Sequence, residues 1–172
     1  MSRSKYLIAI LPPEPFASEI YKLKESFRDQ YNTKGSLNSP AHITLHMPFE
    51  FDNEEKLLVA FKKISIENFT IELKDFGCFE PRVIFVGVKE NPALAACQLN
   101  VMDFCKRELN IFNAGYKDQP FHPHVTVAFR DLKRDSFKRA WDEFKSRSYN
   151  AVFECNRISL LKHDGRFWRE FS

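Results

Sequence analysis

Two short segments of this sequence share one pattern, a histidine and a threonine separated by a single apolar residue. The first is His42-Ile43-Thr44-Leu45, and the second, 82 residues later, is His124-Val125-Thr126-Val127. Alternate side chains of a β-strand point to opposite faces of its sheet, so each histidine shares a face with its threonine. Imidazole and hydroxyl groups need polar surroundings. The pair therefore predicts two strands that present matching polar groups to one cleft.

The segments around the two motifs repeat in the same order. Each motif follows a short apolar strand, a helix with an apolar stripe and a loop that contains glycine, and it precedes a shorter helix. These elements lie at residues 6–11, 15–31, 32–40 and 53–64 in the first copy and at 83–88, 91–112, 113–120 and 135–144 in the second. Two copies predict a pseudo-symmetric duplication rather than a solenoid.

The remaining segments predict the fold class. Residues 69–79 alternate as a strand does, and residues 151–172 are typical of a hairpin whose Asp164-Gly165 pair suits a type I′ turn. Roughly seven strands that pair with near neighbours, together with four helices, favour an antiparallel α+β fold over a parallel sheet. We expect a single domain, 1–172, with two lobes at about 1–80 and 81–172, between which terminal strands could be exchanged.

Composition excludes some functions and decides few. Hydrophobic residues make up 44% and charged residues 28% of the 172 residues, as in ordinary globular proteins. Only 5 glycines are present, which disfavours a glycine-rich phosphate loop. The net charge of +3 is compatible with an anionic ligand but too small to predict nucleic-acid binding by itself.

The cysteines and the apolar runs bear on the cellular compartment. The four cysteines form no CxxC pair and sit in apolar patterns, so we expect buried free thiols: Cys78, Cys97, Cys105 and Cys155. The apolar run at 6–11 is too short for a signal-peptide core, and no run reaches membrane-spanning length. We therefore expect a cytoplasmic, soluble monomer that binds no membrane.

The residue types of the two motifs suit acid–base chemistry at a phosphate. Imidazole titrates near neutrality, so one ring can supply a proton while the other removes one. The hydroxyls of Thr44 and Thr126 can donate hydrogen bonds to phosphate oxygens from the same faces. His42 and His124 would thus serve in-line displacement at phosphorus without a metal ion, and a strained 2′,3′-cyclic phosphate would be an apt substrate.

The two motifs are similar to the paired H-x-T/S-x motifs of the 2H phosphoesterase superfamily. This superfamily includes the 2′-5′ RNA ligase-like proteins and the RNA 2′,3′-cyclic phosphodiesterases. The segment Phe121-His122-Pro123-His124-Val125-Thr126 resembles the second family motif in particular. In layout the resemblance covers nearly the whole chain, whereas its specific signal lies in the two motifs.

The resemblance implies a bilobal α+β fold, with two antiparallel sheets facing a central cleft and helices packed outside. It implies metal-independent cleavage of 2′-5′ or 2′,3′-cyclic phosphodiester bonds of RNA ends or nucleotides, with no cofactor, and it leaves 2′-5′ ligation open. The usual family roles make His42 the proton donor and His124 the acceptor, with Thr44 and Thr126 on the phosphate. The residues themselves do not order the two histidines.

Other residues extend the hypothesis or offer alternatives to it. By strand alternation, His46 and His122 would share the face of the motif histidines and could tune their pKa values or touch substrate.

Four histidines could also bind a transition metal, but further ligands are scarce, so we expect no metal site. A histidine-triad nucleotide-binding protein is disfavoured because Thr126 stands where the third histidine would be needed. Tyr116 and Phe121 are candidates for stacking on a base.

A second hypothesis is a non-catalytic RNA- or nucleotide-binding module that keeps the fold. Both motifs are complete, which favours catalysis, because a pure binder has no evident need for two imidazoles. The substrate stays open between a tRNA fragment, a small cyclic nucleotide and an ADP-ribose derivative.

Overall fold

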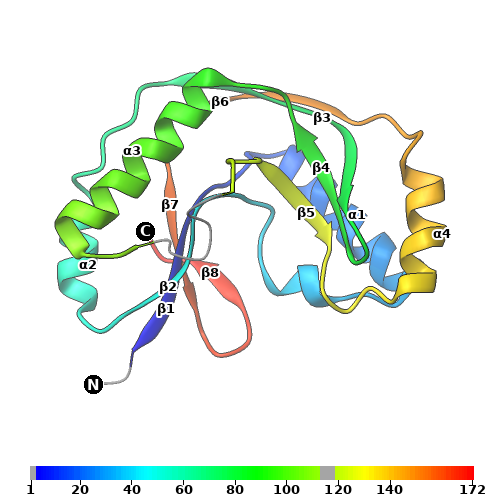
Figure 1. Cartoon of the computed structure of the whole chain (residues 1–172), viewed down its shortest axis with the longest axis horizontal. Coiled ribbons are helices and arrows are strands. Elements are labelled where there is room, and N and C mark those ends of the chain that lie inside the picture. The colour runs from blue at the N-terminus through cyan, green and yellow to red at the C-terminus, as the bar shows by residue number, and fades with distance from the viewer. Residues whose placement is uncertain (1–2, 113–118) are drawn as a thin grey trace.

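The structure is a computed structural model that describes residues 3–112 and 119–172. The described residues form eight strands, four α-helices and one 3₁₀-helix, η1 (Figure 1). The strands are β1 (Ser4–Ile10), β2 (Ile43–Phe51), β3 (Phe69–Phe79), β4 (Val83–Val88), β5 (His124–Ala128), β6 (Asn150–Cys155), β7 (Ser159–His163) and β8 (Trp168–Glu170). The helices are α1 (Phe16–Tyr31), η1 (Gly35–Asn38), α2 (Glu54–Phe61), α3 (Pro92–Leu109) and α4 (Arg134–Phe144).

Local side-chain chemistry explains where several helices begin. The side chain of Asn53 accepts a hydrogen bond from the Lys56 amide at the start of α2, and Asn91 does the same for the Leu94 amide at the start of α3. These caps satisfy amides that have no partner within the helix. Helix α4, expected from residue 135, begins one residue earlier: Lys133 takes the cap position without a side-chain hydrogen bond, and Asp135 lies in the first turn.

All strand pairs of the described residues are antiparallel, which confirms the α+β prediction. The strand order is β6-β3-β4-β5-β2-β1-β7-β8. The two separate sheets of the prediction are instead one hydrogen-bonded sheet. Its two halves join between β2 and β5 through a single aligned pair, Ile43 with Val125.

The halves of the sheet do not follow the halves of the sequence. The first-motif half-sheet consists of β2, β1, β7 and β8, whereas the second-motif half-sheet consists of β5, β4, β3 and β6. Strand β3 lies in the predicted lobe 1–80 but pairs with β4. Strands β7 and β8 lie in 81–172, but β7 pairs with β1, and β8 pairs with β7. Elements are therefore exchanged in both directions, and neither half-sheet is complete without the other part of the chain.

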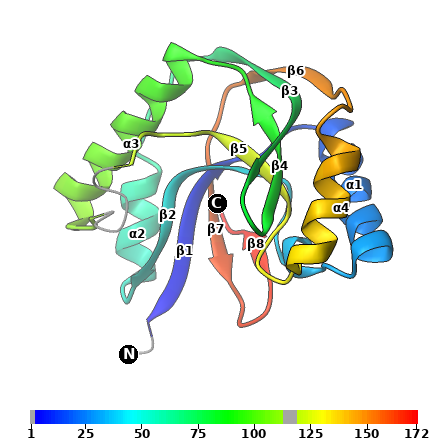
Figure 2. The same ribbon diagram turned by 45° about the vertical axis from the view of Figure 1, so that its right-hand side comes forward.

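The helices lie in two pairs at opposite ends of the molecule, α1 with α4 and α2 with α3 (Figures 1 and 2). Helices α1 and α4 pack on the second-motif half-sheet: the rings of Phe27 and Phe144 lie 4.6 Å apart, and those of Phe76 and Phe144 lie 5.0 Å apart. Helix α3 packs under β2. Strand β2 of the first motif thus packs against α3, which precedes the second motif, and β5 of the second motif packs against α1, which precedes the first.

The C-terminal hairpin is shorter than predicted. Only β7 and β8 form it, and β6 pairs with β3 instead. Its four-residue connection, 164–167, is not the two-residue I′ turn that the sequence suggested. The Asp164 carboxylate accepts hydrogen bonds from the amides of Arg166 and Phe167, and Gly165 alone takes a positive φ there, of 102°.

None of the helices in the described ranges is long and apolar enough to cross a membrane. The four cysteines are free, with Cys97, Cys105 and Cys155 buried and Cys78 partly exposed.

Candidate active site

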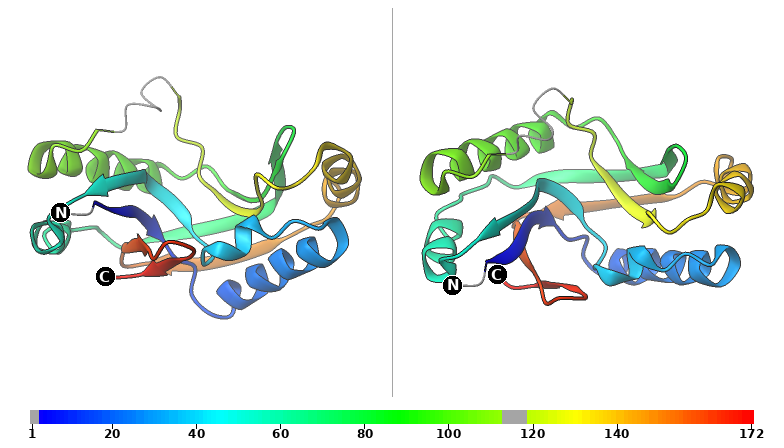
Figure 3. Two further views of the ribbon diagram at one scale, coloured as in Figure 1. Left: turned by 90° about the horizontal axis from the view of Figure 1, so that it is seen from below. Right: turned by 60° about the horizontal axis from the view of Figure 1, so that its bottom comes forward.

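The two motifs meet at the junction between the half-sheets, where β2 and β5 lie side by side (Figure 3). The aligned pair is formed by the residue at the centre of each motif, Ile43 and Val125. In an antiparallel pair, the residue before one partner lies across from the residue after the other. His42 therefore lies across from Thr126, and Thr44 across from His124, all four on one face of the sheet.

The exposure of the side chains agrees with this alternation of the two strand faces. Ile43 and Val125 are fully buried on the core face, whereas His42, Thr44, His124 and Thr126 are each partly exposed. The histidines and threonines predicted from the sequence are thus brought together on one accessible face.

A backbone carbonyl orients each motif histidine. Nδ1 of His42 lies 2.8 Å from the Pro40 carbonyl, and Nδ1 of His124 lies 2.8 Å from the His122 carbonyl. A carbonyl only accepts hydrogen bonds, so both neutral rings carry their proton on Nδ1. Nε2 is then left on each ring as the atom that can take or give a proton.

Both motif histidines hold a proton less readily than an ordinary histidine. Burial lowers the pKa of His42 to about 4; the Pro40 hydrogen bond opposes the shift, and the charges of Lys24 and His124 add to it. Burial also lowers the pKa of His124, again against its carbonyl bond, and His122 adds a smaller repulsion. Without a ligand, both rings are therefore neutral at pH 7.

His46 does not share this face, contrary to the sequence prediction. Irregular pairing of β1 with β2 on both sides of His46 changes the alternation, so that Thr44 pairs with Ala9 but His46 pairs with Ile8. The ring is 1% exposed and packs edge-on against Phe49, 5.1 Å away, in the core. A residue expected to tune the site is therefore a core histidine, and its buried Nε2 has no hydrogen-bond partner.

His122 lies beside His124, with their ring centroids 6.1 Å apart, within a cluster of aromatic rings that no sequence motif indicated. The Phe79 ring lies 5.2 Å from His122 and 5.1 Å from His124, and the Phe85 ring lies 5.5 Å and 5.0 Å from the same two rings. Phe79 stays 41% exposed, whereas Phe85 is buried. Phe85 pairs with Thr126 across the sheet, which places it on the histidine face.

Gly77 makes room for this aromatic cluster. It pairs with Phe85, and a Cβ at position 77 would lie 2.4 Å from the Phe85 ring. Any larger residue there would displace the ring that packs against His124. Glycine in the middle of a strand was the sequence signal that could have revealed this close approach.

The first-motif side of the same face has a different lining. Ala9 pairs with Thr44 and belongs to a small apolar cluster with Leu7 and Leu161, against which Leu11 and Trp168 pack. A hollow of about 560 Å³ opens nearby, between Pro40, the β7–β8 hairpin and Tyr21 of α1.

The loop before the first motif is tied to the strand of the second. The Ser36 hydroxyl donates to the Val127 carbonyl over 2.7 Å, and Asp131 accepts from the Thr33 hydroxyl and from the amides of Lys34 and Gly35. These residues follow no pattern that points to a site, and only the fold brings them together.

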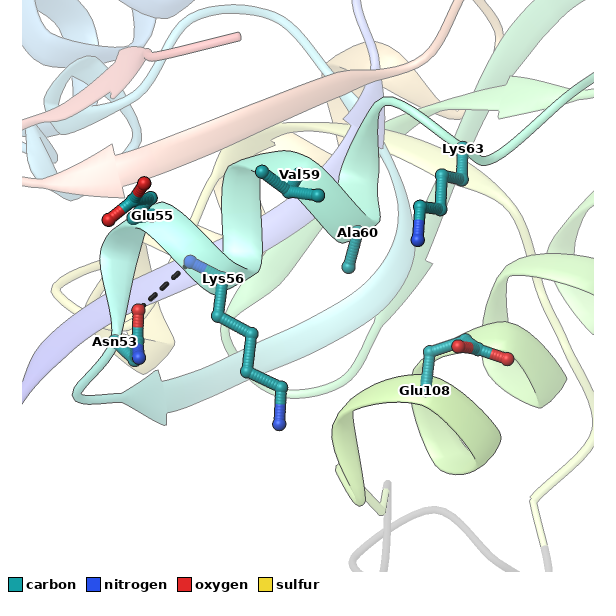
Figure 4. A pocket seen from close by; sticks show the side chains of 7 residues that line it. All are labelled: Asn53, Glu55, Lys56, Val59, Ala60, Lys63 and Glu108. Atoms are coloured by element: carbon teal, nitrogen blue, oxygen red, sulfur yellow. Dashed lines mark hydrogen bonds between the residues drawn. The ribbon is translucent and has the colours of Figure 1, made fainter.

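The two residues proposed to stack on a base, Tyr116 and Phe121, stay predictions in that role. Phe121 is half-buried and packs against the main core, and Tyr116 lies outside the described residues. A second hollow, of about 350 Å³, lies away from both motifs on α2, facing Glu108 of α3 (Figure 4). Within residues 3–112 and 119–172, no three His, Cys, Asp or Glu side chains are grouped so that they could hold a metal ion.

Known sequences resemble this chain over most of its length. It is 28% identical over 167 residues to the RNA 2′,3′-cyclic phosphodiesterase of Methanocaldococcus jannaschii, a match that covers 92% of this chain and 90% of the relative. It is 29% identical over 165 residues to a candidate phosphoesterase of Geobacillus kaustophilus, covering 91% and 87%.

Solved structures share the fold. E. coli LigT in complex with 3′-AMP aligns with a TM-score of 0.63 and 20% identity, over 99% of this chain and 97% of that one. TT0787 of Thermus thermophilus aligns with a TM-score of 0.61 and 18% identity, over 98% and 95%. A family model described as the 2′-5′ RNA ligase superfamily matches residues 12–166. The chain therefore belongs to the 2′-5′ RNA ligase superfamily.

Proposed function

We propose that this protein is a metal-independent phosphodiesterase that acts on 2′,3′-cyclic phosphate or 2′-5′ phosphodiester bonds of RNA ends or nucleotides. The observation that carries the proposal is the alignment of Ile43 with Val125, which sets two histidines and two threonines on one face. Membership of the superfamily supports phosphoester chemistry. The name of the Methanocaldococcus relative supports the cyclic-phosphate substrate.

The two rings divide the reaction through their Nε2 atoms, which the Nδ1 hydrogen bonds leave free. One ring, neutral, takes a proton from water on Nε2 as the water oxygen bonds to phosphorus. The other ring, protonated, gives its Nε2 proton to the ribose oxygen that leaves. In the family order, His42 is the donor and His124 the acceptor, and we propose the same order here.

The negative charge of a bound phosphate would promote the protonation of one ring, which the proton-donor role requires. Burial keeps both rings neutral in the free protein, but a phosphate anion between them favours protonation of one. The hydroxyls of Thr44 and Thr126 would donate to the non-bridging oxygens, where negative charge develops in the transition state. Binding and protonation would thus occur together.

Hydrolysis of a 2′,3′-cyclic nucleotide in EDTA tests this proposal. We expect turnover in EDTA, a bell-shaped dependence of kcat/KM on pH, and loss of turnover when both His42 and His124 are replaced by alanine. Loss of activity in EDTA would refute the metal-independent mechanism, and full activity of the double variant would refute the assigned roles. Ligand binding without turnover would instead identify a non-catalytic nucleotide-binding module. The monomeric state and the cytoplasmic location stay predictions.

A further inference from the structure

Lys24 is a buried cation beneath the first motif. It lies in the buried stripe of α1 and is 1% exposed. Its Nζ donates to the Ser36 carbonyl and to the Ser39 carbonyl, each over 2.9 Å. No carboxylate in the described part of the chain forms an ion pair with it.

Such a group is costly for a fold to keep. An ammonium ion taken out of water loses its hydration, and two neutral carbonyls replace only part of that loss. Burial accordingly lowers the pKa of Lys24 to about 8. A methionine or leucine would fill the stripe of α1 without this cost, so the position demands a reason beyond packing.

The two carbonyls that Lys24 binds belong to the segment that carries His42. Ser39 precedes Pro40, whose carbonyl holds the His42 ring through Nδ1. Ser36 also donates its hydroxyl to Val127, in the strand of the second motif. Hydrogen bonds and the short backbone segment that they hold therefore connect Lys24 to both motifs.

We propose that Lys24 is a positioning residue of the active site, whose buried ammonium group clamps residues 36–39 and provides a fixed positive charge beside His42. This inference rests on the proposed phosphodiesterase function. The clamp holds the His42 ring against the second-motif strand, and the charge favours an anion between the two motifs. Lys24 thus acts on the phosphate through His42 and the loop, without touching it.

Few other charged groups near Lys24 could change the affinity for an anion between pH 7 and pH 9.5. The titratable groups that lie near Lys24 or contact α1 from other elements include His42, His124, Asp131, Tyr149 beside Glu19, and Glu143 with Arg139 beside Tyr31. Burial by itself would raise the pKa of the Asp131 carboxyl, but hydrogen bonds from the Thr33 hydroxyl and the loop amides lower it, so Asp131 stays charged throughout the neutral range. Among these groups, Lys24 is therefore the one expected to lose its charge between pH 7 and pH 9.5.

Two substitutions separate the clamp from the charge. Lys24→Met removes both, whereas Lys24→Gln keeps an amide donor for the carbonyls and removes only the charge. We expect the sulfate Kd, followed by NMR titration, to weaken about threefold or more in both variants. We expect kcat to fall about tenfold or more in Lys24→Met, with a smaller loss in Lys24→Gln. Because the Lys24 charge lowers the pKa of His42, the proposed proton donor, the alkaline limb of kcat/KM should move to higher pH in both variants.

Lys22→Met is the matched control, because Lys22 is an exposed lysine on the same helix. It should leave the sulfate Kd, the kcat and the pH profile unchanged. Folded Lys24 variants with the sulfate affinity and pH profile of the wild type would overturn the proposal, whatever their thermal stability.

If neither Lys24 variant folds, a His42→Asn/His124→Asn double variant that keeps Lys24 decides the question, because no motif imidazole can then take up a proton with the anion. Its sulfate Kd at constant ionic strength should weaken about threefold between pH 7 and pH 9.5, since sulfate itself does not titrate there. A constant Kd would overturn the proposal. Sulfate binding is measured without turnover, so a wild-type protein that hydrolyses no cyclic nucleotide would refute the phosphodiesterase function while leaving this result interpretable.

Discussion

The two motif histidines occupy matching places in a duplicated pattern, but their neighbours differ. His42 lies beside a buried cation, Lys24, and a loop held by hydrogen bonds. His124 lies among the rings of Phe79, Phe85 and His122. The repeated motif places the backbone and the ring nitrogens alike in both halves, whereas the packed neighbours give each ring its own electrostatic environment.

The same difference appears in the two long helices. The buried stripe of α1 includes a charged residue, Lys24. The buried stripe of α3 consists of apolar residues and cysteines, namely Leu94, Cys97, Val101, Cys105 and Leu109. A site built from two similar halves can assign different roles to its two histidines only through such differences.

The strongest test of this comparison removes one histidine at a time. His42→Asn and His124→Asn should each lower kcat by about 10²- to 10⁴-fold, because each removes an Nε2 that moves a proton. Each should also abolish one limb of the pH–rate profile, and the two variants should lose opposite limbs. Single-turnover rates from pH 5 to pH 9 measure this. Loss of the same limb in both variants would contradict a division of roles.

The threonines test whether the halves are equivalent toward phosphate. Thr44→Val and Thr126→Val each remove a hydroxyl on the histidine face and keep the shape of the side chain. We expect each to lower kcat/KM about 10-fold to 100-fold, which corresponds to about 1.5–3 kcal/mol for a hydrogen bond to a charged group. Similar losses would support the pseudo-symmetric site. An unchanged kcat/KM in either variant would remove that threonine from it.

The aromatic cluster can be broken on the second-motif side alone. A Cβ at Gly77 would collide with the Phe85 ring, so Gly77→Ala should lower the free energy of unfolding by about 1–3 kcal/mol and displace the ring beside His124. Urea denaturation measures the stability. The double variant Gly77→Ala with Phe85→Leu should recover part of the loss, since the smaller side chain makes room. If the losses in the free energy of unfolding of the two single variants simply add in the double variant, the two positions do not interact.

The smallest expected effect concerns stability in acid. His46 is buried, which lowers its pKa, so between neutral pH and moderate acidity the unfolded chain takes up a proton that the folded chain does not. Stability must therefore fall as pH falls through the ordinary histidine pKa of about 6.5, by at most about 1.4 kcal/mol per pH unit for this group. His46→Leu should reduce that slope between pH 6.5 and pH 5. An equal slope in both proteins would show that His46 is not held neutral by the fold.

Several elements could be predicted because their signals are local. Helix α2 begins after Asn53 and α3 after Asn91, as expected, since an asparagine side chain can bind the amides two or three residues ahead whatever the rest of the fold does. Alternation likewise predicted that Val125 and Val127 face the core while His124 and Thr126 do not.

The failures came from interactions between distant segments. The alternation that assigned His46 to the polar face assumed regular pairing, and the irregular register of β2 with β1 reversed it. The hairpin predicted for residues 151–172 is confined to β7 and β8, because β6 pairs with β3, which lies far earlier in the chain. Neither partner strand can be identified from the residues of the segment itself.

The amino-acid sequence alone established the two His-x-Thr motifs, their spacing and the α+β character of the chain, because periodicity and helix caps act over a few residues. Tertiary structure decided that Ile43 and Val125 align, that Phe79 and Phe85 surround His124, and that Lys24 lies beneath His42. These contacts join residues that are far apart in sequence. They arise only when the whole sheet pairs and its helices pack, so no local pattern encodes them.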